Sequence, residues 1–167
     1  HSIDYLGFKK INNQKCIDWV EAKNPDIIFA VGFSQLLRDT WLKMPKMGCI
    51  GFHPTKLPEG RGRAPLAWII LEKKMGAANF FLMGEGADDG PIITQSLFDV
   101  EENDNANEVE SKIGIHIEKS LDSWLPDLRK GIWNPIPQDH SAASWYGKRG
   151  PEDGWLDWHQ SAQYLNR

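Results

Sequence analysis

Apolar side chains in this sequence recur in two patterns, one with helical spacing and one as short continuous runs. Cys16, Ile17 and Val20 lie at helical spacing within residues 13–23, which predicts an amphipathic helix there. Residues 27–31 read Ile-Ile-Phe-Ala-Val and precede a glycine. Such a run is typical of a strand buried on both faces. The first two expected elements are therefore a helix and a buried strand.

The same two patterns alternate along the rest of the chain. We expect helices at 36–43, 64–74 and from 105 onward, and strands at 49–52, 78–83 and 92–99. Asn105 and Glu108 form a capping box at the start of the last helix, and Pro126 should kink or end it. Strands alternating with helices indicate an α/β fold, here a Rossmann-like, mostly parallel sheet with helices on both faces.

Composition and length are those of one ordinary domain. The 167 residues are 41% hydrophobic and 25% charged, and the net charge of -4 argues against a nucleic-acid-binding surface. No apolar run approaches the ~20 residues of a membrane span, and two cysteines are too few for a disulfide scaffold, so we expect a cytoplasmic location. We assign residues 1–132 to a catalytic core and 133–167 to a covering segment or a linker. His1 stands where a methionine would begin a complete chain, which leaves room for an upstream segment.

Two loops at expected strand ends hold the residues best suited to chemistry. In α/β folds, function gathers at the carboxyl ends of the strands. His53 begins one such loop, and Asp88 lies in the other among three glycines. A histidine paired with a carboxylate transfers protons near neutral pH. For His53 alone, a structural role is an equally good interpretation.

Basic residues next to His53 suggest anion recognition. Arg61 and Arg63 flank Gly62, and guanidinium groups on a loop suit phosphate or carboxylate binding. An ion pair with Glu59 is the competing interpretation. The other histidines and the cysteines lack the spacing of metal ligands, so we expect no metal site.

Residues 48–68 read Gly-Cys-Ile-Gly-Phe-His-Pro-Thr-Lys-Leu-Pro-Glu-Gly-Arg-Gly-Arg-Ala-Pro-Leu-Ala-Trp. This segment resembles the active-site motif of the folate-dependent formyltransferases, Asn-x-His-x-Ser-x-Leu-Pro followed by Arg-Gly. Residues 88–95 resemble the family's Asp-x-Gly element, and residues 151–158 are similar to a segment that follows the catalytic domain. The family includes methionyl-tRNA, glycinamide ribonucleotide and sugar-nucleotide formyltransferases. The resemblance runs from about residue 11 to the end.

The resemblance implies a reaction and roles for individual residues. An amine would attack the formyl carbon of the co-substrate 10-formyltetrahydrofolate, with His53 and Asp88 as the catalytic pair. The segment 31–37 would hold the pterin ring through its backbone. The implied folate-binding residues are Phe33, Gln35, Leu37 and Gly86. Arg61 and Arg63 would bind the acceptor substrate.

Two departures from the family pattern affect these expectations. Gly51 stands where the family has a catalytic asparagine, and losing one oxyanion donor costs about 100- to 1000-fold in rate. Asn79, on a neighbouring strand, is our candidate for a substitute donor; an ordinary polar strand residue is the alternative. The strand, helix and strand that normally begin the family's domain are also missing from this sequence.

The acceptor is narrowed by the same resemblance. The run from Gly60 to Trp68 is closest to the sugar-nucleotide branch, so a nucleotide-linked amino sugar is the expected acceptor. Methionyl-tRNA is the alternative acceptor. The negative net charge disfavours nucleic acid as a partner but does not exclude tRNA. A degenerate module that binds folate or a partner without catalysis is the alternative of another class. We expect no membrane partner and keep a homodimer open.

Overall fold

A mixed four-stranded sheet forms the centre of the computed structural model, which describes residues 3–165. Its strands lie in the order β1 (Ile28–Ala30), β2 (Cys49–Thr55), β4 (Gly76–Leu82) and β5 (Ile92–Phe98). β1 and β2 are parallel, whereas β2–β4 and β4–β5 are antiparallel. The expected α/β architecture is confirmed, but the sheet is not mostly parallel. The loop 83–91 is too short for the crossover of about a dozen residues that a parallel β4–β5 pair would need.

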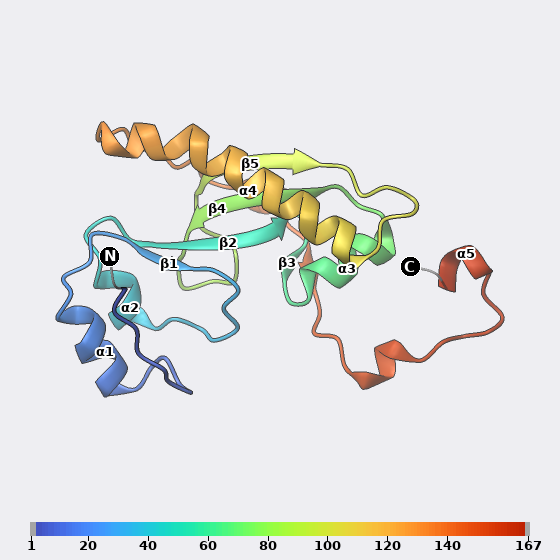
Figure 1. The fold of residues 1–167 in the computed structure, drawn as a ribbon, viewed down its shortest axis with the longest axis horizontal. Coiled ribbons are helices and arrows are strands. Elements are labelled where there is room, and N and C mark those ends of the chain that lie inside the picture. Colours follow the sequence, from blue (N-terminus) through green and yellow to red (C-terminus); the bar gives the residue numbers. More distant parts are fainter. Residues whose placement is uncertain (1–2, 166–167) are drawn as a thin grey trace.

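One face of the sheet is covered by the long helix α4, Ala106–Arg129 (Figure 1). The expected capping box of Asn105 and Glu108 is present at its start. Trp124 on this helix packs in a cluster with Ile50 and Phe80 of the strands. Pro126 does not end the helix, which continues to Arg129.

The opposite face is covered at one end by α1 (Gln14–Glu21) and α2 (Asp39–Lys43). Cys16 and Trp41 on these helices pack against Cys49, the first residue of β2. The Asn13 side chain accepts a hydrogen bond from the backbone N–H of Cys16, which fixes the start of α1. α2 begins three residues later than the apolar pattern predicted.

The edge position of β1 corrects another expectation. The run 27–31 was predicted to be buried on both faces, yet Phe29 is 46% and Val31 54% exposed. Within residues 3–165, β1 pairs with β2 alone. An edge strand keeps part of its side chains in solvent, even where its sequence is apolar.

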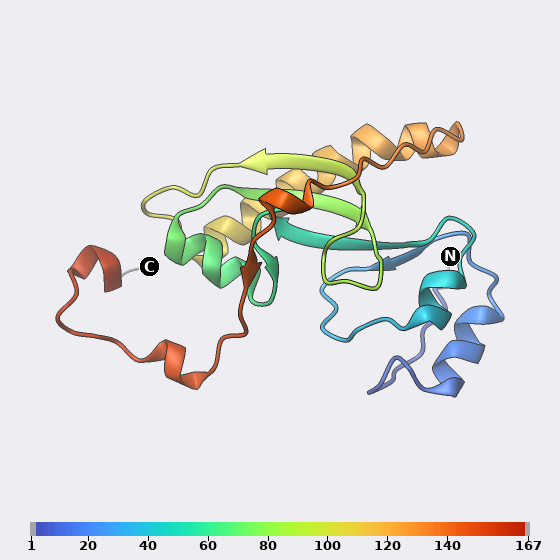
Figure 2. The same cartoon turned by 180° about the vertical axis from the view of Figure 1, so that it is seen from behind.

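Three short elements lie beside the carboxyl end of β2 (Figure 1). The short strand β3 (Arg61–Gly62) precedes α3 (Pro65–Glu72) and pairs in parallel with β6 (Trp145–Tyr146). Figure 2 shows the chain after α4 crossing the sheet on the side away from α4, before it reaches β6. A 3₁₀ helix, His140–Ala142, precedes β6, and a second one, Pro151–Gly154, and the helix α5 (Ala162–Leu165) follow it. No helix within residues 3–165 is both long and apolar enough to cross a membrane.

Candidate active site

The strand register places a row of polar side chains on the face of the sheet away from α4. His53 of β2 lies opposite Asn79 of β4, and Asn79 lies opposite Gln95 of β5. Residues directly opposite on neighbouring strands project from the same face. His53 and Asn79 are buried, with 5% and 0% exposure. Buried polar groups must be hydrogen-bonded to be stable, so the partners of this row define the site.

His53 and Asp88 lie next to each other, as the resemblance to the formyltransferases implied. His53 Nδ1 lies 3.5 Å from Asp88 Oδ2, and His53 Nε2 lies 2.8 Å from the carbonyl oxygen of Gly60. A carbonyl oxygen only accepts hydrogen bonds, so Nε2 carries a proton in this arrangement. The His53 side chain is 6% exposed and that of Asp88 is 21% exposed. Asp88 is therefore the member of the pair that is open to an incoming group.

The backbone of the loop holds the Asp88 carboxylate in place. Asp88 Oδ2 accepts a hydrogen bond of 2.9 Å from the N–H of Gly62. Asp88 itself has a φ of 52°, in the left-handed region that Asp adopts more readily than most side chains. Gly62 has a φ of 103°, and a Cβ at this position would lie 2.5 Å from the carbonyl oxygen of Tyr146. Glycine is thus required where the backbone turns toward Asp88.

A cavity of about 720 Å³ opens beside the pair. This volume is in the usual range for small-molecule sites. His53 and Asp88 line it together with all four residues that the sequence assigned to folate binding, Phe33, Gln35, Leu37 and Gly86. The Gln35 side chain is occupied elsewhere, because it accepts from the Ile11 N–H and donates to the Lys9 carbonyl. Both ends of its amide group therefore already have a partner within the protein.

Asn79 does not line the cavity. Its Nδ2 donates to the carbonyl oxygens of His53, at 2.8 Å, and of Thr55, while its Oδ1 accepts from Gln95 Nε2 at 2.6 Å. Both amide protons are therefore used to hold the backbone of β2 at its irregularity between His53 and Thr55. In this arrangement Asn79 has no N–H left for an oxyanion, and it supports the His53 backbone instead.

The space next to Gly51 is filled by an aromatic ring. Gly51 lies opposite Phe81 on β4, and a Cβ at position 51 would lie 2.7 Å from Phe81 Cζ. Real Cβ atoms do not approach this closely, so any side chain at 51 requires Phe81 to move. The Phe81 ring thus occupies the space that an asparagine side chain at position 51 would need.

The two arginines have different environments. Arg63 lines the cavity. Arg61 is 1% exposed, and its guanidinium donates to Gln138 Oε1 from Nε at 3.2 Å and from a terminal nitrogen at 2.7 Å. In the described chain neither arginine forms an ion pair with Glu59. The structure brings Arg63 to the cavity and keeps Arg61 out of it.

Gln138 is a site residue that the sequence did not reveal. Its Nε2 donates to the carbonyl oxygen of Asp88 at 2.9 Å and to that of Gly90 at 2.7 Å, and the residue is 6% exposed. It belongs to the segment after α4, far from either loop in the sequence. In the sequence it stands between two turn-forming residues, Pro137 and Asp139, and this setting does not indicate a buried residue.

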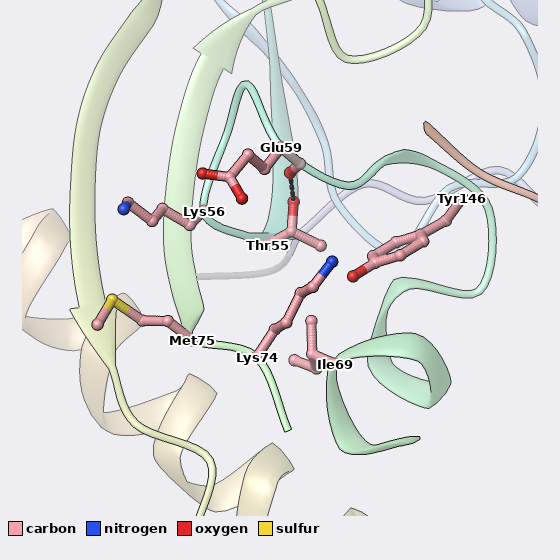
Figure 3. A pocket seen from close by; sticks show the side chains of 7 residues that line it. All are labelled: Thr55, Lys56, Glu59, Ile69, Lys74, Met75 and Tyr146. Atoms are coloured by element: carbon pink, nitrogen blue, oxygen red, sulfur yellow. Dashed lines mark hydrogen bonds between the residues drawn. The ribbon is translucent and has the colours of Figure 1, made fainter. Parts of the chain in front are cut away.

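A second cavity, of about 190 Å³, lies on the other side of the loop that follows β2 (Figure 3). It holds none of the site residues that the sequence predicted. The hydroxyl of Thr55 donates to the carbonyl oxygen of Glu59 at its wall. Tyr146, also in the wall, donates to Glu72, which in turn pairs with Lys74. Its lining is Thr55, Lys56, Glu59, Ile69, Lys74, Met75 and Tyr146.

Sequence comparison relates this chain to known proteins. The model of the formyl transferase family matches residues 6–121. The chain is 34% identical over 166 residues to the bifunctional polymyxin resistance protein ArnA of Wigglesworthia glossinidia brevipalpis, covering 99% of this chain and 25% of that protein. It is 33% identical over 166 residues to the methionyl-tRNA formyltransferase of Bacillus subtilis, covering 99% of this chain and 52% of that protein. The chain thus spans at most about half the length of these relatives.

A solved structure shares the fold. The formyltransferase PseJ from Anoxybacillus kamchatkensis, crystallised with UDP-4,6-dideoxy-4-formamido-L-AltNAc and tetrahydrofolate, superposes with a TM-score of 0.69. The two chains are 24% identical, and the match covers 85% of this chain and 71% of PseJ. At this level of identity the likeness establishes the fold.

Proposed function

The chain belongs to the formyl transferase family, and we propose that its protein moves a formyl group from 10-formyltetrahydrofolate to an amine. The observation that carries this proposal is the His53–Asp88 pair beside the cavity of about 720 Å³. A carboxylate that is open to the cavity and backed by a buried histidine is suited to removing a proton from an amine. The tetrahydrofolate in the PseJ structure supports the choice of carrier.

The reaction needs one nucleophilic attack and the movement of one proton from the amine to the folate nitrogen. The amine nitrogen forms a bond to the formyl carbon, and the carbonyl electron pair moves to oxygen. When this intermediate collapses, the bond between the formyl carbon and the folate nitrogen breaks. The amine proton passes first to Asp88 and then to the departing folate nitrogen. His53 stabilises the charges of the His53–Asp88 pair during these two transfers. Atoms and charge balance without a metal or a redox partner.

The cavity lining suggests where each substrate lies. We place the pterin along the backbone of 33–37, because the Gln35 side chain is already occupied within the protein. Arg63 has a charged group at the cavity and suits an anionic part of a substrate. A nucleotide-linked amino sugar is the acceptor that we favour, supported by the sugar nucleotide bound to PseJ and by the run Gly60–Trp68.

Two other functions have specific support. Methionyl-tRNA is the alternative acceptor, because the Bacillus subtilis relative is a methionyl-tRNA formyltransferase. A module that binds folate without catalysis is favoured by two features, Gly51 in place of an amide donor and Asn79 with both of its protons occupied. A missing oxyanion donor lowers the rate by about 100- to 1000-fold.

The deciding experiment is a transfer assay with the native protein that contains this chain. It is incubated with 10-formyltetrahydrofolate and either nucleotide-linked amino sugars or initiator methionyl-tRNA, and formyl transfer is followed by folate absorbance and by mass. We expect transfer to a sugar, lost in His53→Ala and Asp88→Ala and retained in the control His159→Ala, whose exposed ring contacts Asp157. Folate binding without transfer to any acceptor would instead support the binding module.

A further inference from the structure

We infer that Gln138 and Arg61 are positioning residues that hold Asp88 in its catalytic geometry, an inference that rests on the proposed function. Neither residue lines the cavity. Both are almost completely buried, Gln138 at 6% and Arg61 at 1% exposure. They connect the segment after α4 to the two loops that carry the His53–Asp88 pair.

The Gln138 amide group binds the backbone of the Asp88 loop without lining the cavity. Its two N–H donors are directed to the carbonyl oxygens of Asp88 and Gly90, at 2.9 and 2.7 Å. Asp88 has a left-handed backbone, which costs free energy and persists only where the surroundings fix it. Two hydrogen bonds to carbonyl groups two residues apart in the loop supply that constraint.

Arg61 fixes the other end of the Gln138 amide. Two of its nitrogens donate to Gln138 Oε1, so the oxygen cannot exchange places with the Nε2 group. A cation bound to the amide oxygen also polarises the amide and strengthens the hydrogen bonds that its N–H groups donate. The guanidinium lies 5.5 Å from the Trp145 ring and 3.3 Å from His140 Nδ1. Its side-chain partners are thus the Gln138 oxygen, the His140 ring and the Trp145 ring, and within residues 3–165 it forms no ion pair with a carboxylate.

The same segment also fixes the donor that binds the Asp88 carboxylate. Gly62 supplies that N–H, and its neighbours Arg61 and Arg63 donate their backbone N–H groups to the carbonyls of Ser144 and Tyr146. Residues 138–146 therefore hold Asp88 at two points, the backbone through Gln138 and the carboxylate through Gly62. A displacement of about 1 Å at a reacting group lowers the rate by about 100-fold, so this constraint acts on turnover.

A role only in docking the segment onto the sheet must be separated from a role in positioning Asp88. Gln138→Glu separates them, because it keeps an oxygen for Arg61 and turns the contact into an ion pair, yet has no N–H for the Asp88 and Gly90 carbonyls. Gln138→Ala removes both functions. Gln160→Ala is the matched control, since that exposed glutamine contacts Asp157.

The experiment measures formyl transfer by these variants of the native protein. We expect Gln138→Glu and Gln138→Ala to lower kcat by about 10- to 100-fold with less than a threefold change in the KM for folate. Gln138→Glu should keep the thermal midpoint of the native protein, and Gln160→Ala should behave as the native protein. In an Asp88→Asn background the Gln138 changes should cause no further loss, because they act through Asp88.

Two results of the transfer assay would overturn the inference: native kcat in Gln138→Glu, or the same fold-loss from Gln138→Ala with and without Asp88→Asn. Amide hydrogen exchange supplies a readout that does not depend on turnover. If Gln138 holds the loop, exchange in residues 84–90 accelerates in Gln138→Glu while the sheet is unchanged. Faster exchange in a protein that transfers no formyl group would refute the proposed function and keep the constraint; unchanged exchange would refute the constraint itself.

Discussion

Strands β2 and β4 present side chains of opposite character on their two faces. Toward α4 the strands contribute Ile50, Phe52 and Phe80, which pack against Trp124. Away from α4 they contribute His53 and Asn79, whose polar atoms have hydrogen-bond partners. The Trp124 indole N–H on the apolar side is buried without a partner. Around His53 and Asn79, the face toward α4 is therefore held by packing, which has no direction, and the opposite face by directional bonds, which fix geometry.

The largest effect should follow from changing the charge on the polar side. Asp88→Asn keeps an oxygen for the Gly62 N–H but removes the proton acceptor, so we expect kcat to fall by about 100- to 10,000-fold. The free energy of unfolding, measured in urea, should change little. Asp89→Asn is the neighbouring control and should retain native turnover. A fall in stability as large as the fall in rate would mean that Asp88 is a structural residue.

The reverse result is expected on the apolar side. Phe80→Ala opens a cavity beneath α4 and should lower the free energy of unfolding by about 3–5 kcal/mol. Turnover per folded molecule should stay close to native, because the Phe80 ring is directed away from the cavity beside His53 and Asp88. Leu97→Ala, at a position 41% exposed on β5, is the control and should cost far less. A selective loss of kcat in Phe80→Ala would show that the two faces are not separable.

A smaller effect should come from restoring the amide at position 51. Gly51→Asn brings a side chain into the space of the Phe81 ring, and overpacking of this kind costs about 1–3 kcal/mol of stability. Phe81→Leu removes the two ring atoms that approach most closely. We therefore expect the double variant to be more stable than the sum of the single changes predicts, as measured by denaturant unfolding. Simple additivity would show that the backbone moves instead of the ring.

The smallest effect at neutral pH is expected for Cys49. This residue lies on the face of the sheet away from α4, at the end that α1 and α2 cover. Burial raises the pKa of the Cys49 thiol to about 11, from 9.0. Below pH 9 the thiol is neutral in both states, so its contribution to stability is constant; from pH 9 to 11 the unfolded state ionises first and stability falls. Cys49→Ala should lack this part of the decline in an unfolding series over pH. Identical profiles for both proteins would contradict the shift.

Local signals in the sequence predicted most of the elements. The capping box at Asn105 and the helical spacing before Val20 identified two helices, and the glycine-rich loop identified Asp88 as an inward carboxylate. These features depend on residues a few positions apart, where spacing and turn chemistry decide the structure. The resemblance to the formyltransferases then paired Asp88 with His53, and the structure has them adjacent.

The features that the sequence did not predict are contacts between distant segments. The direction of β4, the burial of Arg61 and the bonds of Gln138 depend on which strands and loops meet in space. Phe81 fills the space beside Gly51 only because the register of β2 and β4 pairs them. Asn79 illustrates the same point. The sequence predicted that its strand lies beside the strand of His53, but not that its amide group bonds to the His53 backbone.

The late position of Gln138 has a consequence for how the protein is made. Gln138 lies 50 residues after Asp88 and 77 after Arg61. A ribosome that has synthesised the chain through β5 and α4 has therefore produced His53 and Asp88 without the amide group that bonds to the Asp88 loop. The hydrogen bonds from residues 138–146 to this loop and to β3 can form only after that segment emerges, so we expect the proposed site to be completed after the sheet on which it stands.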